Sequence, residues 1–178
     1  MDFANDLATL KAMTEQLEDY LLSDVEFWQL SGSSQFPKLS LGTYLLTRRR
    51  LGAAPDHRAE ITALCQRGDA VLAQWQAAAE RKAAKELHTR LTLWQNYLDD
   101  WQGHYATEVA QRVMAALLLR HFPKLSTTPD AKHFSTLDVQ LQGRARKAAF
   151  VWAPELQPAF PEDDFWFLYR QPLPPRSS

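Results

Sequence analysis

The chain has 178 residues, a length that suits one domain with a substantial buried core. Hydrophobic residues make up 46% and charged residues 23% of it, so a disordered chain is excluded. The single cysteine, Cys65, excludes an intrachain disulfide, and the first residues lack the basic and apolar regions of a signal peptide. The longest apolar run, 113–119, is too short to cross a bilayer. We therefore expect a soluble, cytoplasmic protein with no membrane contact.

Charge is distributed unevenly along the chain although the net charge is only −1. Residues 1–30 carry seven acids and one base, whereas residues 31–90 carry ten bases and five acids. This pattern fits an acidic helix packed beside a basic one, or a basic surface for an anionic partner. Because the total is near zero, we favour packing within the fold.

The first predicted element is a helix over residues 3–21, where apolar residues recur at steps of three and four. Ser23 and Glu26 then have the spacing of a capping box, which predicts a short helix over 24–30. The Gly-, Ser- and Pro-rich segment 31–37 should end that helix.

A second helix is predicted over residues 41–51, because Ser40 is a good N-cap and Gly52 a good C-terminal stop. Three arginines fall in its last turn, where positive charge interacts favourably with the helix dipole. These are Arg48, Arg49 and Arg50.

The longest helical pattern runs from Asp56, a plausible N-cap, to about Trp101. An unbroken helix of this length would span about 68 Å. A compact chain of this size has a diameter of only about 40 Å. We expect a long, bent central helix, with a break at Gly68 as the alternative.

Two more helices follow Gly103. The first is predicted over 105–122. Thr128 and Pro129 provide an N-cap and a first helical residue for the next helix, whose apolar pattern ends near Phe150.

The composition changes after that point, since residues 150–178 contain six prolines and seven aromatic residues. Frequent proline is incompatible with a long helix or a central strand, so we predict an irregular strap with a frayed end after Pro172. The predicted fold is all-α, with about five helices in a bundle-like arrangement and one long central helix. Residues 1–150 form the helical domain, and residues 151–178 form the strap packed on it.

Recognisable catalytic, metal-binding and nucleotide-binding motifs are absent from the sequence. None of the five histidines has a glutamate three residues before it, and one cysteine cannot form a zinc cage. Cys65 lies at an apolar helical position and is interpreted as structural. We expect no catalytic residue, no metal and no cofactor, and we favour a protein that is not an enzyme.

Basic residues form clusters that could bind nucleic acid if they shared one face. Besides the arginines at 48–50 there are two further clusters. Acidic residues flank the cluster at 81–85, so we favour a solvated surface over a nucleic-acid site. The clusters are Arg81, Lys82 and Lys85, and Arg144, Arg146 and Lys147.

Small and aromatic residues mark two further faces of the long helix. Alanines within 77–90 allow close helix packing, inside the chain or at a dimer seam. Downstream lies an aromatic stripe that fits either core or the wall of a ligand pocket. The pocket candidates are Trp94, Tyr97, Trp101, His104, Tyr105 and Glu108.

Taken together, these features favour a non-enzymatic helical scaffold or protein-interaction domain that forms a homodimer or binds another protein. The first alternative is nucleic-acid binding through the basic clusters. The second is small-ligand binding or an enzyme at the aromatic wall.

Overall fold

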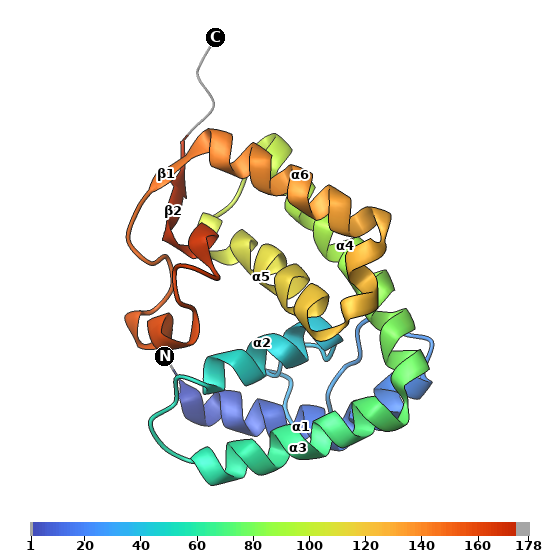
Figure 1. The fold of residues 1–178 in the computed structure, drawn as a ribbon. Coiled ribbons are helices and arrows are strands. Elements are labelled where there is room, and N and C mark those ends of the chain that lie inside the picture. The colour runs from blue at the N-terminus through green and yellow to red at the C-terminus, as the bar shows by residue number, and fades with distance from the viewer. Residues whose placement is uncertain (1, 174–178) are drawn as a thin grey trace. The chain divides into compact units, whose positions relative to one another are not determined.

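The computed structural model describes residues 2–173, and within them the fold is all-α with an irregular C-terminal strap (Figure 1). This confirms the predicted fold class. None of the described helices is both long and apolar enough to cross a membrane. The α-helices are α1 (Phe3–Leu22), α2 (Leu41–Leu51), α3 (Arg58–Gln74), α4 (Gln76–Asp100), α5 (Tyr105–His121) and α6 (Pro129–Arg144). Three 3-10 helices and two short strands complete it: η1 (Pro123–Thr127), η2 (Pro154–Ala159), η3 (Trp166–Tyr169), β1 (Ala145–Lys147) and β2 (Arg170–Pro172).

Contacts within the chain group into two compact units, with the boundary inside α4 after Glu86. Unit 1 contains α1, α2, α3 and the first half of α4. Unit 2 contains the second half of α4, α5, α6 and the strap. The division into residues 1–150 and 151–178 stays a prediction, and each unit is described by itself below.

In unit 1, α1 packs against α2 and α3 (Figure 1). Its predicted apolar stripe is buried, and Leu10, Met13 and Leu17 are fully enclosed. Asp2 caps the helix by accepting a hydrogen bond of 3.0 Å from the backbone N–H of Asn5. The hydrophobic spacing therefore predicted the orientation of α1 correctly.

The prediction of a short helix over residues 24–30 is wrong. Ser23 does not begin a helix but ends α1, because both its backbone N–H and its hydroxyl donate to the Tyr20 carbonyl, at 3.2 and 2.7 Å. The following residues are non-helical, and Trp28 and Leu39 form an isolated antiparallel bridge with two 2.8 Å hydrogen bonds. Bonds with distant residues thus outweigh the local capping pattern.

The capping of α2 is as predicted. Ser40 and Thr43 form a reciprocal capping box, and Gly52 ends the helix. Glu86, fully buried on α4, adds to this cap by accepting from the Ser40 hydroxyl at 2.6 Å and from the Gly42 N–H at 2.9 Å. A carboxylate stabilises a helix N-terminus by meeting its free N–H groups, so Glu86 fixes α2 relative to the first half of α4.

The predicted long helix is divided, but at Trp75 and not at Gly68. Trp75 has φ −111° and ψ 37°, and it separates α3 from α4. Gly68 lies inside α3, where it allows Tyr44 to approach closely. The N-cap is His57, with a left-handed φ of 62°, and not the predicted Asp56. The break explains why six α-helices are described where about five were expected.

In unit 2, α5 follows Gly103 as predicted, and Thr128 and Pro129 begin α6 as predicted. Helix α6 ends at Arg144, earlier than the predicted Phe150. The next three residues form β1, which pairs with β2 in an antiparallel ribbon. The strand partner lies far along the chain, so the local helical pattern did not indicate this end.

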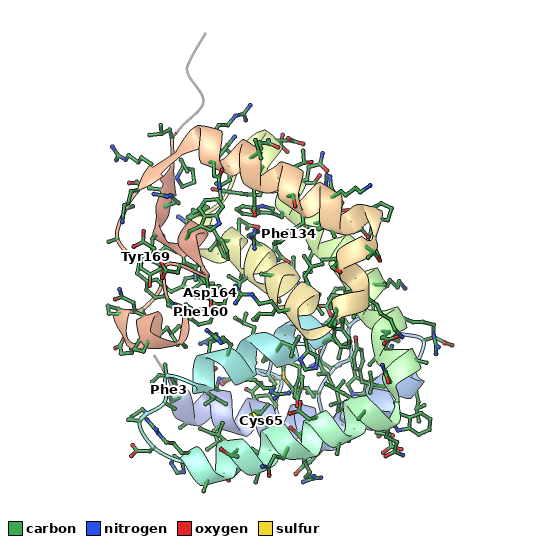
Figure 2. The ribbon with its side chains drawn as sticks, viewed as in Figure 1. Phe3, Cys65, Phe134, Phe160, Asp164 and Tyr169 are labelled. Atoms are coloured by element: carbon green, nitrogen blue, oxygen red, sulfur yellow. The ribbon has the colours of Figure 1, made fainter. Side chains whose placement is uncertain are left out.

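The strap folds onto its own unit. Figure 2 shows Phe160 and Tyr169 within it, and the Tyr169 hydroxyl donates to the Phe160 carbonyl at 2.8 Å. The Trp152 indole donates to the Ala106 carbonyl of α5 at 2.6 Å. Aromatic contacts thus hold the strap, in whose described part regular structure is limited to two 3-10 helices and one short strand. Apart from Leu173, the predicted frayed end after Pro172 lies outside the described residues.

Candidate interaction site

A cavity of about 260 Å³ opens in unit 1 beside the C-terminal end of α1. The end of α1, the non-helical segment after it and one side of the first half of α4 surround it. We call it the α1–α4 pocket. Its lining residues are Tyr20, Leu21, Leu22, Ser23, Asp24, Val25, Glu26, Ala78, Arg81, Lys82 and Lys85.

The α1 side of the α1–α4 pocket carries exposed aliphatic side chains beside the carboxylates of Asp24 and Glu26. Among the large hydrophobic side chains that the structure describes, five are exposed, and two of these line the pocket. Leu22 is 54% exposed and Val25 is 47% exposed. Exposed aliphatic side chains gathered at a concave site favour a binding surface over a purely solvated one.

The other side of the pocket is cationic. The Lys82 ammonium donates to the Val25 carbonyl at 2.5 Å and lies 4.3 Å from the centre of the Tyr20 ring. Lys85 forms a 3.6 Å ion pair with Glu26. These contacts tie the segment after α1 to α4 and thereby shape the pocket. Arg81 is exposed, and within the described chain it has no ion-pair partner.

Partial burial lowers the pKa of Lys82 below its ordinary value, and the neighbouring Lys85 lowers it further. The carboxylates of Asp24 and Glu26 act in the opposite direction. Burial dominates, so the charged ammonium is less favourable here than in water. An additional anion in the pocket would stabilise it.

The arginine cluster at the end of α2 is used differently. Arg48 donates two hydrogen bonds to the Asp69 carboxylate, at 2.6 and 3.2 Å, and Arg50 pairs with Asp6 at 3.2 Å. Arg49 is half-buried beside them. Carboxylates of unit 1 thus compensate much of this positive charge, which weakens the case for a nucleic-acid surface. At the other cluster, Lys147 pairs with Glu162 at 2.9 Å.

The predicted aromatic stripe forms part of the core of unit 2. Trp94 is fully buried and stacks on Tyr97, with ring centroids 5.4 Å apart. Tyr105 lies 6.2 Å from both rings, and Trp101 lies 5.7 Å from Tyr97. The interpretation as core therefore accounts for these rings. The remaining pocket candidates lie at the start of α5: the exposed N-cap His104, and Glu108, half-buried.

Sequence reasoning missed the most buried charge of unit 2, Arg112 on α5. Its guanidinium forms two 2.7 Å hydrogen bonds with Asp138, and lies 3.7 and 4.1 Å from the ring centres of Phe134 and Phe167. Figure 2 labels Phe134 on α6, and Phe167 belongs to the strap. Burial lowers the pKa of Arg112, while Asp138 opposes this. A charged residue within the apolar face of α5 was the signal available.

The Arg112 cluster fastens elements together and presents no open site. Tyr105 supports it, because its hydroxyl donates to the Phe167 carbonyl at 2.6 Å. Burial raises the pKa of Tyr105 far above its ordinary value. Arginine sandwiched between aromatic rings and paired with a carboxylate is a strong structural contact. We therefore assign this cluster to the fixing of the strap on α5 and α6.

Other candidate centres are weaker. Cys65 is half-buried on α3 (Figure 2), with its thiol free. Among residues 2–173, no group of three or more His, Cys, Asp and Glu side chains could hold a metal ion. A second cavity in unit 1, of about 200 Å³, has a mostly apolar lining that includes Phe3, Leu7 and Ile61. Its only charged or titratable lining groups are Asp56 and His57.

Comparison of the chain with protein-family models, with curated proteins and with solved structures gives no match. The fold defines an all-α protein. Its function has to be argued from the α1–α4 pocket and its surroundings.

Proposed function

We propose that the protein is a non-enzymatic helical interaction domain, and that the α1–α4 pocket binds an acidic segment of a protein partner that carries an aliphatic side chain. The observation that carries this proposal is the meeting of exposed Leu22 and Val25 with the cationic side of α4 in one cavity.

The size of the pocket favours a protein segment over a small molecule. Ligand sites that enclose a drug-sized molecule occupy about 300–1,000 Å³. A cavity of about 260 Å³ lies just below this range. It can accept one or two side chains, while the rest of a partner lies over exposed Leu22 and Val25. Burial of these two side chains would supply the main part of the binding free energy.

Three cations and two carboxylates line the pocket, and one of the carboxylates, Glu26, is paired with Lys85, so the remaining balance favours an acidic partner. Arg81 is exposed and without an ion-pair partner in the described chain, and Lys82 is partly desolvated. Each exposed ion pair contributes about 0.2–1 kcal/mol, which is small beside the apolar term. The cations therefore act mainly on orientation and specificity, and they repel basic segments.

The test uses two fluorescein-labelled helical peptides, one with Leu and Glu at helical spacing and one with Lys in place of each Glu. We expect fluorescence anisotropy to report binding of the acidic peptide only. Val25→Asp and Arg81→Glu should each weaken this binding at least fivefold. Arg67→Glu is the matched control, since Arg67 is an exposed arginine on α3 outside the pocket.

The proposal is overturned if both peptides bind equally or if the pocket variants bind like the wild type. Retention of the wild-type protein on heparin that falls steeply with salt, without peptide binding, would instead support nucleic-acid binding through the basic clusters.

A further inference from the structure

We infer that the partner held by the α1–α4 pocket is a second copy of this chain, bound through the acidic outer face of α1 in a symmetric dimer. This inference rests on the proposed function and names its partner.

The outer face of α1 has the chemistry that the pocket requires. Glu15, Glu18, Asp19 and Leu22 recur at helical spacing and are all exposed. Three carboxylates and one aliphatic side chain thus lie on one face. Within the described chain none of the three carboxylates has an ion-pair partner.

The other charged side chains of α1 form ion pairs within unit 1, and among the described residues this face differs from them in having none. Asp6 pairs with Arg50 at 3.2 Å, and Lys11 pairs with Glu60 at 2.5 Å. Glu26, just after the helix, pairs with Lys85. Packing between an acidic and a basic segment therefore explains only part of the uneven charge along the chain.

The acidic face and the cationic side border the same pocket. Leu22 belongs to the acidic face and also lines the pocket, while Arg81 and Lys85 line it from α4. A two-fold axis through this region would set the acids of each copy against the cations of the other. In such an isologous interface every contact occurs twice. Leu22 and Val25 of both copies would then meet near the axis, where they lose their exposure.

The buried alanines of α4 do not provide a close helix–helix seam for this interface. Ala79 and Ala83 are fully buried and Ala78 is nearly so. Their methyl groups are therefore not free for a close helix–helix seam between copies. The inferred contact uses the charged flank of α4 instead, and should weaken as salt screens it.

A charge-swap experiment tests the inference on the full chain. Sedimentation velocity over a concentration series should show a wild-type monomer–dimer equilibrium that shifts toward monomer at high salt. Glu18→Arg and Arg81→Glu should each weaken self-association at least tenfold, because each change makes two symmetric contacts repulsive. Arg67→Glu, which reverses the same kind of charge as Arg81→Glu, should leave the equilibrium unchanged.

The decisive measurement is the self-association of a mixture of the two charge-reversed variants. In the mixed dimer, one copy carries the Glu18→Arg change and keeps its native Arg81. Both of these cations then meet acids of the other copy, namely its native Glu18 and the glutamate introduced by Arg81→Glu. We expect the mixture to dimerise with an affinity within about threefold of the wild type. A mixture that stays monomeric, or single variants that dimerise like the wild type, would overturn the pairing.

Failure of this inference can be told from failure of the proposed function. If the wild type is monomeric at every concentration but binds the acidic peptide, the second-copy inference is overturned and the interaction domain stands. If it neither dimerises nor binds the peptide, both are overturned.

Discussion

Replacement by alanine of two glycines within α-helices should change the free energy of unfolding in opposite directions. Gly68 lies in α3 and Gly143 in α6. Away from other contacts, alanine stabilises a helix interior by up to about 1 kcal/mol relative to glycine. A methyl group at Gly143 meets no atom within 4 Å. Gly143→Ala should therefore raise the free energy of unfolding, by a few tenths to about 1 kcal/mol near the helix end.

At Gly68 the same methyl group has no space. It would lie 1.7 Å from the Tyr44 hydroxyl oxygen and 2.8 Å from the ring carbon that carries it. Since an ordinary contact begins at about 3.4 Å, the hydroxyl would have to withdraw by about 1.7 Å. Tyr44 is fully buried, so this movement disturbs its neighbours. Overpacking of this kind costs about 1–3 kcal/mol, which exceeds the gain in helix propensity.

Urea unfolding followed by circular dichroism measures both changes. We expect Gly68→Ala to lower the free energy of unfolding by about 1–2 kcal/mol. Adding Tyr44→Phe removes the nearest oxygen and should recover part of the loss. Equal effects of Gly68→Ala and Gly143→Ala, or no recovery in the double variant, would refute the close approach of α2 to α3.

Two further predictions concern unit 2. Arg112→Met should lower the free energy of unfolding by about 3 kcal/mol because it leaves Asp138 without its partner, and Arg112→Met/Asp138→Leu should lose less than the single variant. An additive double variant in urea unfolding would exclude this coupling. Tyr105→Phe should cost about 1 kcal/mol at neutral pH through loss of the bond to Phe167. The raised pKa of Tyr105 stabilises the fold below about pH 10, where the unfolded side chain begins to ionise, and this contribution is lost as the pH rises further. The difference in the free energy of unfolding between Tyr105→Phe and the wild type should thus narrow above about pH 10. A difference that does not change with pH would contradict the burial of the Tyr105 hydroxyl.

Much of the helical framework could be predicted from local signals. The stripe on α1, the Ser40 cap of α2 and the Thr128–Pro129 start of α6 each depend on residues within a few positions of one another. Such signals are independent of tertiary structure, and they were correct where no distant group competed with them.

Two of the errors share one physical origin, which is competition from distant partners. Ser23 had the spacing of a helix start, but in the fold the Val25 carbonyl bonds to Lys82 on α4. Helix α6 ends early because β1 pairs with β2, a partner that the local pattern cannot reveal. The break at Trp75 lies among good helix formers, and the sequence has no signal for it.

The same limit applies to the candidate site. Arg81, Lys82 and Lys85 were identified as a cluster, yet the exposed Val25 of the pocket lies after α1 in a segment that had been predicted to be helical. In the aromatic stripe, Trp94 and Tyr97 are buried, while Trp101 and Tyr105 are half-buried. Arg112 was missed because its partner Asp138 and its aromatic neighbours lie on other elements.

Because the strap belongs to unit 2, the two units can complete their packing at different stages of translation. All contacts that define unit 1 lie within residues up to Glu86, so it can fold while later residues are still being made. The guanidinium of Arg112, in contrast, gains its second aromatic neighbour only when Phe167 has left the ribosome. Until then the Arg112 side of α5 lacks its cover from the strap, so unit 2 can complete its packing only after the last of its elements has emerged.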